Sequence, residues 1–410
     1  MTNALLDGER VGLRCEDGTI AAIGPDVGPQ PDDEEVIDAG GAHLVPPLVN
    51  GHTHAAMTLF RGSGGDLPLM PWLQERIWPV EAKLDAEDVY WGARLACAEM
   101  IRSGTTRFWD MYWQPEATAR AVEDAGIRAA IGAPLFDVQS SFEQLRASAH
   151  RSLEALGSFG PLVTTALAPH AIYTVSEESL RWIGELSAER GLPVQIHLSE
   201  TEKEVQDCIA EHGERPAQYL DRLGLLSECT VLAHGVWLDP EELALVAERG
   251  ATVVSNPVAN LKLAVGGVFP HPGARAAGVR VGLGTDGAGS NDSLDLLADL
   301  KFFALTQKHA AGDPTAIDAA EAWAVATGAR APLLGASPLE PGAPADFLLL
   351  PPDAPELGIG DLTSDLVYAA TGSVVDTTVV AGRVLMRNGE IEGLDEIVAK
   401  AGERAHRLGL

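Results

Sequence analysis

The segment His43–His54, HLVPPLVNGHTH, joins a short apolar run to two histidines separated by one residue. The apolar run has the length of a buried strand, and helical periodicity follows it. Further segments of the same kind recur up to about residue 340, each followed by a helix candidate. The expected strands are residues 43–50, 105–110, 128–136, 162–168, 193–198, 230–234, 252–256 and 280–286. This alternation predicts an α/β fold, a (β/α)8 TIM barrel whose active site lies at the carboxyl ends of the strands.

Both ends of the chain depart from this alternation. Apolar runs separated by glycine and aspartate turns occur within residues 11–24 and 345–391, and neither region is long enough to form a core alone. We therefore expect the two termini to come together as a small β-sandwich beside the barrel. The expected division is residues 1–46 with 341–395 for the sandwich, 47–340 for the catalytic barrel and 396–410 for a C-terminal helix.

Composition narrows the class of protein. The 410 residues include 29 lysines and arginines and 59 aspartates and glutamates, a net charge of −30 that repels nucleic acid and anionic membranes. The four cysteines have no CxxC spacing, so neither a disulfide framework nor a cysteine zinc site is indicated. No secretory signal pattern and no apolar stretch of about 18 residues occurs. We expect a cytoplasmic protein that acts on a small molecule.

Groups suited to metal binding follow several of the expected strands. His52 and His54 are two residues apart, and in an extended chain such residues point to the same side. His197 ends the fifth strand, His234 the sixth and Asp286 the eighth. Each is singly compatible with an ordinary polar strand end, but together they bring zinc-type ligands to one mouth of the barrel. The pattern predicts a metal centre.

A carboxylate with two interpretations lies beside one of these ligands. Glu200 follows His197 by three residues, in the stretch QIHLSE. One interpretation is a helix-start carboxylate, because acidic residues are favoured in the first turn of a helix. The other is an acid beside the metal that donates a proton to the substrate and then to the departing group. Spacing alone leaves both open.

The ligand pattern resembles that of the amidohydrolase superfamily over nearly the whole chain. Two-metal members usually need a bridging lysine or glutamate from the fourth strand, and residues 162–170, LVTTALAPH, contain neither. The resemblance therefore implies one divalent metal per subunit, held by His52, His54, His197 and Asp286. Zn²⁺ is the first expectation, with Fe²⁺, Mn²⁺ and Ni²⁺ as alternatives.

The resemblance also implies how such a centre works. A bound metal lowers the pKa of its water toward about 7, so a metal-activated hydroxide is the expected nucleophile. Asp286 would accept the proton of that water, and His234 would orient it.

A finer resemblance concerns the deaminases of S-adenosylhomocysteine, 5'-methylthioadenosine and related adenosine nucleosides. It is carried by residues 51–62, 67–84, 168–180, 197–205, 255–267 and 284–296. It implies that Glu200 is the proton shuttle to purine N1, that Glu81 holds the ribose hydroxyls and that His170 contacts the substrate. Trp72 lies in the same segment as Glu81 and either lines the pocket or packs in the core. The resemblance further suggests a homo-oligomer, a dimer or a tetramer.

One departure bears on the substrate. Members that take S-adenosylhomocysteine usually have an arginine after the third strand, where this chain has Ala133-Pro134. Arg146 and Arg151 follow downstream, where a helix surface is the favoured location. This departure favours adenosine, 5'-methylthioadenosine or 5'-deoxyadenosine over the carboxylate-bearing nucleoside.

Two alternatives to nucleoside deamination remain at this stage. One keeps the site and changes the substrate to another aminated heterocycle, such as guanine, 8-oxoguanine, a pterin or a triazine. Glu81 discriminates here, since a free base has no ribose diol to hold. The other alternative is a barrel that has lost catalysis, which is disfavoured because no ligand of the pattern is missing.

Overall fold

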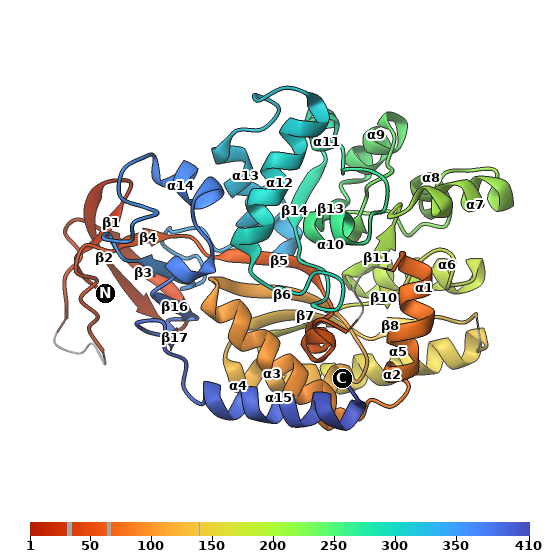
Figure 1. Cartoon of the computed structure of the whole chain (residues 1–410), viewed down its shortest axis with the longest axis horizontal. Coiled ribbons are helices and arrows are strands. Elements are labelled where there is room, and N and C mark those ends of the chain that lie inside the picture. Colours follow the sequence, from red (N-terminus) through yellow and green to blue (C-terminus); the bar gives the residue numbers. More distant parts are fainter. Residues whose placement is uncertain (31–34, 64–66, 139) are drawn as a thin grey trace.

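The computed structural model describes residues 1–30, 35–63, 67–138 and 140–410 (Figure 1). Within them, eight parallel strands form one sheet in the order β11-β12-β13-β14-β5-β6-β7-β9. Isolated parallel bridges between Leu167 and Val194 and between Ala171 and His197 close this sheet into a barrel. The strands are β5 (Leu48–Thr53), β6 (Thr105–Met111), β7 (Arg128–Gly132), β9 (Val163–Thr165), β11 (Val194–Leu198), β12 (Thr230–His234), β13 (Thr252–Ser255) and β14 (Arg280–Leu283). The predicted (β/α)8 barrel is confirmed.

Three expected strands, at residues 43–50, 128–136 and 162–168, were wrong in their bounds because each is interrupted. Pro46 and Pro47 divide the first into β4 (His43–Val45), which belongs to the terminal sheet, and the barrel strand β5. Proline lacks the amide hydrogen that a ladder needs, so it marks the change of sheet. The third expected strand ends at Gly132, and Pro134–Leu135 (β8) instead pairs with Ala168–Pro169 (β10).

Helices cover the outside of the barrel, and an apolar cluster fills one end of its interior. Val49, Trp109, Val231 and Val254 pack there against Leu334, which comes from the segment after α13. The opposite end is therefore the one available for a site. The α-helices of the described chain are α1 (Leu69–Trp72), α2 (Trp78–Glu81), α3 (Ala86–Arg102), α4 (Pro115–Ala125), α5 (Phe142–Leu156), α6 (Glu177–Arg190), α7 (Glu202–His212), α8 (Pro216–Arg222), α9 (Pro240–Arg249), α10 (Pro257–Lys262), α11 (His271–Ala277), α12 (Leu296–Ala311), α13 (Ala319–Ala326), α14 (Leu362–Tyr368) and α15 (Leu394–Leu408).

Both termini contribute to a second sheet at one side of the barrel (Figure 1). Its described strands run in the order β17-β16-β15-β4-β1-β2-β3 around their own apolar cluster, which includes Leu13, Leu44 and Phe347. Their bounds are β1 (Ala4–Leu6), β2 (Glu9–Glu16), β3 (Thr19–Gly24), β15 (Phe347–Leu350), β16 (Thr377–Val380) and β17 (Arg383–Met386). This arrangement agrees with the expected β-sandwich, and the exact bounds 1–46 with 341–395 stay a prediction.

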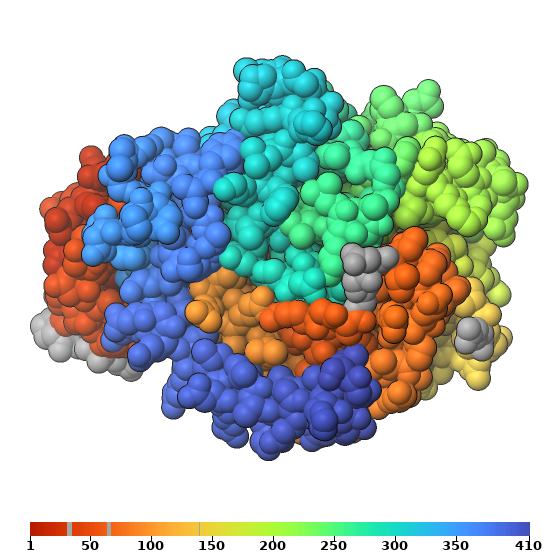
Figure 2. All heavy atoms as spheres, viewed as in Figure 1, coloured from red at the N-terminus to blue at the C-terminus, as the bar shows by residue number. Residues whose placement is uncertain are grey.

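The last helix, α15, lies along the barrel against α3 (Figures 1 and 2). Arg407 donates a hydrogen bond to the backbone carbonyl of Lys83 at 3.1 Å and pairs with the buried carboxylate of Asp88. Leu408 and Ala401 join the apolar cluster that contains Trp72. The chain end thus packs beside the segment that leads to α3. Among the helices described, none is long and apolar enough to cross a bilayer.

Candidate metal centre and active site

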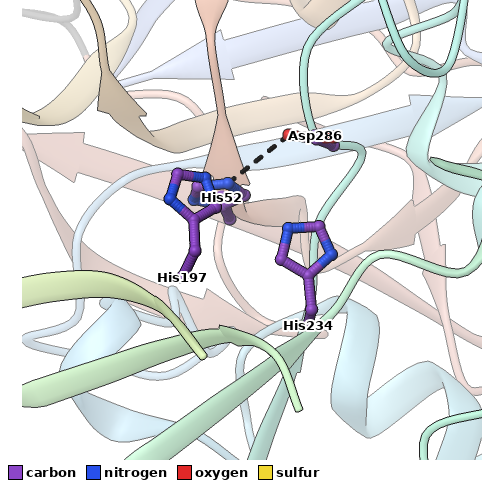
Figure 3. Close-up of side chains that lie close together, drawn as sticks. All are labelled: His52, His197, His234 and Asp286. Carbon is purple, nitrogen blue, oxygen red and sulfur yellow. Dashed lines mark ion pairs between the residues drawn. The ribbon is translucent and has the colours of Figure 1, made fainter. Parts of the chain in front are cut away.

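Three histidines and an aspartate from four barrel strands meet at the carboxyl end of the sheet (Figure 3). His52 lies within β5, His197 within β11 and His234 at the end of β12, while Asp286 follows β14. All four are buried, and one ligand atom of each lies within 4.8 Å of the others. Nitrogen and carboxylate oxygen donors at this spacing suit a divalent transition metal.

His54 also reaches this cluster. Its Nε2 lies 3.2 Å from Asp286 Oδ1 and 3.3 Å from His197 Nε2. The five side chains expected at the metal centre are therefore brought together. The sequence analysis placed His234 beside the bound water and His54 among the ligands, whereas the group of four whose ligand atoms all lie within 4.8 Å of one another contains His234 in place of His54. Which four of the five donors bind the metal stays a proposal.

Backbone carbonyls orient two of the imidazoles. Nδ1 of His54 donates to the carbonyl of Met111 at 2.6 Å, and Nδ1 of His197 donates to that of His170 at 2.7 Å. A carbonyl can only accept, so Nδ1 carries a proton in both residues and Nε2 is the nitrogen that faces the cluster. This is the tautomer that a metal ligand needs, and such hydrogen bonds commonly support metal-binding histidines.

His234 is fixed in the same way by a side chain. Its Nδ1 lies 2.8 Å from Oδ1 of Asn260, which comes from α10. With the proton on Nδ1, the Nε2 lone pair is free to bind a metal or to accept a hydrogen bond from a water molecule. Asn260 was not singled out from the sequence, because only the folded chain brings α10 to the end of β12.

Buried atoms without partners mark the centre of the cluster. His52 Nε2 lies 3.4 Å from Asp286 Oδ1, beyond normal hydrogen-bond length, and neither atom has a hydrogen-bond partner in the described part of the chain. The other oxygen of Asp286 accepts from Ser290 at 2.5 Å. Buried polar atoms are costly when unsatisfied, and a bound cation would satisfy both.

The charges of the cluster favour a cation at its centre. Burial opposes ionisation of Asp286, but the imidazoles of His52 and His54 outweigh it and hold the pKa of Asp286 well below its ordinary value. Burial lowers the pKa of His52 to about 4, whereas in His54 the effect of burial is outweighed by Asp286, which raises the pKa of His54 to about 9. A metal ion would replace the proton on His54.

The backbone is strained where the site is built. Ser199, His234 and Asp286 have φ values of 51°, 75° and 60°, in the left-handed region that non-glycine residues rarely adopt. Such conformations cost about 1–3 kcal/mol each and concentrate at functional sites. Here Ser199 follows β11, His234 ends β12 and Asp286 follows β14, so the three left-handed residues lie where the chain leaves the barrel strands at the site.

Glu200 is buried beside this cluster. Its side chain lines the same pocket as His197 and Asp286, and its Oε1 lies 3.9 Å from His234 Nδ1. The cap of α7 is Thr201, whose hydroxyl accepts from the amide of Glu204. Glu200 is only 6% exposed. It therefore neither caps the helix nor faces water, and the helix-start interpretation of Glu200 does not agree with the structure.

A second glutamate supports the position of Glu200. The carboxylate of Glu204 accepts hydrogen bonds from the backbone amides of Ser199 at 2.7 Å and of Glu200 at 2.9 Å. Burial, reinforced by Asp286 and opposed by His54, raises the pKa of Glu200 to about 8. A carboxyl group with this pKa carries a proton at neutral pH, as a general acid must. Glu204, the residue that supports Glu200, was not predicted, and its position four residues after Glu200 is the only sign of it in the sequence.

The residues expected at the substrate line the pocket that opens from the cluster. Glu81 at the end of α2, His170 after β10 and Trp72 in α1 all contribute to its wall. Trp72 also belongs to an apolar core cluster, so both of its proposed locations apply. Burial raises the pKa of Glu81, while Tyr112 and Trp113 beside it act in the opposite direction.

Other parts of the pocket were not found from the sequence. Tyr112, Trp113, Phe136 and Tyr173 also line it. Each follows or lies near a strand end, which is the signal that sequence reasoning could have used. The aromatic lining is suited to stacking against a planar heterocycle.

The structure also shows the segment after the third strand, where this chain has Ala133-Pro134 in place of the arginine usual in S-adenosylhomocysteine deaminases. Pro134 lines the pocket and Arg146 does not. The guanidinium carbon of Arg146 instead lies 5.3 Å from the ring centre of Phe142 and 5.4 Å from that of Trp182, and Arg151 is exposed on α5. Both arginines occupy a helix surface, as expected.

Comparison with known proteins identifies the family. The amidohydrolase family model matches residues 43–385. A 5'-deoxyadenosine deaminase from Methanoregula boonei is 48% identical over 383 residues, 92% of this chain and 86% of that protein. A 5-methylthioadenosine/S-adenosylhomocysteine deaminase from Moorella thermoacetica is 45% identical over 91% of this chain and 89% of its own. The crystal structure of a zinc-bound adenosine deaminase from Xanthomonas campestris gives a TM-score of 0.89 at 36% identity, over 97% of this chain and 93% of that one. The chain belongs to the amidohydrolase family.

Proposed function

We propose that this protein hydrolyses the 6-amino group of an adenosine-type nucleoside, releasing ammonia and the inosine analogue. The observation that carries the proposal is the buried carboxyl group of Glu200 beside the cluster of His52, His197, His234 and Asp286. Hydrolysis of an amidine carbon needs a nucleophile on one side and a proton donor on the other, and these groups supply the places for both. Relatives named as deaminases of adenosine nucleosides, at 45–48% identity, support the same reaction.

One divalent metal fits the residues present. His52, His54, His197 and Asp286 are the proposed ligands, and Zn²⁺ is the proposed ion because the related adenosine deaminase structure contains it. The unpartnered atoms of His52 and Asp286 support this assignment. When bound, such an ion makes hydroxide available near neutral pH, since it lowers the pKa of a water molecule toward about 7.

The side chains around the metal have distinct proton-transfer roles. Asp286 is ionised and accepts a proton from the attacking water. His234, whose Nδ1 is fixed by Asn260, orients that water through Nε2. Glu200 begins protonated and donates to N1 of the purine as C6 is attacked. Its carboxylate then takes the proton of the new C6 hydroxyl and carries it to the departing amine, and the proton held by Asp286 afterwards restores Glu200. Negative charge on the ring is thereby avoided.

The substrate's sugar lies further from the metal. Glu81 accepts hydrogen bonds from the two ribose hydroxyls, for which a carboxylate with two oxygens is suited. His170 contacts the nucleoside, with its Nδ1 fixed 2.9 Å from the hydroxyl of Thr174. Trp72 contributes apolar wall near the base.

We further infer a homo-oligomer, a dimer or a tetramer, working in the cytoplasm. The resemblance to adenosine-nucleoside deaminases supports the assembly, and the cysteines, all unpaired in the structure, suit a reducing compartment. Light scattering coupled to size-exclusion chromatography measures the assembly directly.

An ammonia-release screen tests the reaction. The zinc-loaded protein is offered adenosine, 5'-deoxyadenosine, 5'-methylthioadenosine, S-adenosylhomocysteine, adenine, guanine and a pterin at equal concentration. We expect ammonia and an inosine analogue from the nucleosides. Turnover of a free base or a pterin with no turnover of any nucleoside would reject the proposal in favour of another aminated heterocycle.

A further inference from the structure

The pocket that contains the proposed metal site continues into a second pocket. We call it the outer pocket, and its walls are formed chiefly by Trp78, Trp113, Phe136 and Val138, with Glu81 and His170 where it meets the inner one. Trp78, Glu81, Trp113, Phe136 and His170 line both spaces, so the two are continuous. Its volume is about 490 Å³. It is large enough for a substituent that extends beyond the ribose.

The walls of the outer pocket are largely aromatic and apolar. Trp113 and Phe136 pack with ring centres 5.1 Å apart, and Phe136 lies 5.6 Å from His170. Trp78 and Val138 at the rim are 42% and 63% exposed. Large apolar side chains left exposed beside a cavity commonly mark a binding surface. An apolar group would cover them and gain from leaving water.

The outer pocket offers no lasting positive charge. No lysine or arginine lines either pocket in the described chain, and the residues outside the described ranges include none. Arg76 and Lys83, on the chain segment that carries Trp78, are exposed and line neither pocket. The carboxylate of Glu81 lies on the wall that the two pockets share, so an anion placed there would meet an acidic group and no lysine or arginine.

We propose that the outer pocket selects nucleosides whose 5' substituent is uncharged and apolar, and disfavours those that carry a carboxylate or phosphate there. This inference rests on the proposed function, because a base at the metal and a ribose at Glu81 direct the 5' carbon into the outer pocket. A carboxylate placed there loses water and finds no cationic partner, which is costly. Short thioether, alkyl and deoxy groups are apolar and would pack against the apolar and aromatic walls of the outer pocket.

A matched pair of probes tests this selectivity. One is 5'-butylthio-5'-deoxyadenosine, and the other is the same nucleoside with the terminal methyl group replaced by a carboxylate. We expect kcat/KM for the neutral probe to exceed that for the charged probe by at least about tenfold. Equal values, or preference for the carboxylate, would overturn the inference.

Two controls separate the pocket from the protein's overall charge of −30. Val138→Arg adds a cation at the rim and should reduce the ratio of the two kcat/KM values about threefold, as expected of an exposed ion pair. Val138→Met, which lengthens the side chain but keeps it apolar and uncharged, should not reduce that ratio. In 1 M salt, where screening extends over about 3 Å, most of the preference should survive. If the preference for the neutral probe vanishes in 1 M salt, its cause is long-range repulsion between the protein's net charge and the charged probe, and the inference is overturned.

The two proposals fail in different ways. If neither probe is deaminated, the proposed function fails, and calorimetric Kd values for the same two probes then decide the selectivity of the pocket. If both are deaminated equally well, the function stands and the selectivity is rejected.

Discussion

The two ends of the continuous cavity are built differently. At the inner end, His52, His197 and His234 come from barrel strands and are almost completely buried. At the outer end, Trp78 and Glu81 come from a short helix in the connection between β5 and α3, and Trp78 is 42% exposed. Strands held on both sides by parallel partners fix geometry closely, whereas connecting segments tolerate change. We therefore propose that the inner end determines the reaction and that the outer end determines which substrate undergoes it.

Removing a metal ligand at the inner end should have the largest effect. His197→Ala should lower kcat/KM by about 10³ or more and reduce the bound metal below one per subunit, because the charge stabilisation that a metal supplies is lost. Metal analysis and ammonia release measure both quantities. His150→Ala, an exposed histidine of α5, is the matched control and should change neither. A His197 variant with full metal content and activity would contradict the assignment.

The next largest effect is expected for the proton donor. Glu200→Gln should keep the metal and lower kcat by about 10² or more, the range for a general acid-base group. The amide keeps the shape of the side chain but cannot donate an acidic proton. Glu202→Gln, at an exposed position two residues later, serves as control. Near-normal turnover of the Glu200 variant would reject the shuttle.

The pH dependence tests the same group without changing its shape. Since burial raises the pKa of Glu200 to about 8 and the protonated form is the donor, kcat should fall as pH rises through about 8. Above that value the decrease should approach tenfold per pH unit, because one proton is required. The Glu200→Gln variant should lack this alkaline limb. If the Glu200→Gln variant shows the same decrease of kcat above about pH 8, the decrease belongs to a group other than Glu200.

At the outer end the expected change is smaller and appears in a different kinetic constant. Glu81→Ala should raise KM for adenosine about tenfold or more, since two hydrogen bonds to a carboxylate are lost. Metal content should stay the same. Steady-state kinetics with adenosine measure this change. If KM for the nucleoside is unaltered, a free base becomes the better substrate and the proposed division between the two ends does not hold.

Much of the fold and of the inner end could be predicted from the sequence. Apolar runs of strand length locate the barrel, and the residues that follow the strands locate the cluster, because parallel strands bring their carboxyl ends to one edge. The error at residues 43–50 arose because β4 and β5 read as one apolar run, although Pro46-Pro47 separates strands of two different sheets.

The supporting contacts could not be predicted, because they depend on tertiary structure. Asn260 reaches His234 from 26 residues away, and nothing in the spacing reveals it. The interpretation of Glu200 depended on whether Thr201 or Glu200 caps α7, and only the backbone decides that. The outer pocket is likewise formed by Trp78, Trp113 and Phe136, which lie on different connections between barrel strands.

The most direct test of the central claim follows the oxygen atom that enters the product. Zinc-loaded protein is incubated with 5'-deoxyadenosine in oxygen-18 water, and the nucleoside product is analysed by mass spectrometry alongside ammonia. Hydrolytic deamination predicts 5'-deoxyinosine with oxygen-18 at C6 and an equal amount of ammonia. Recovery of unchanged nucleoside from a protein that carries its metal and deaminates a free purine base or a pterin would contradict the account.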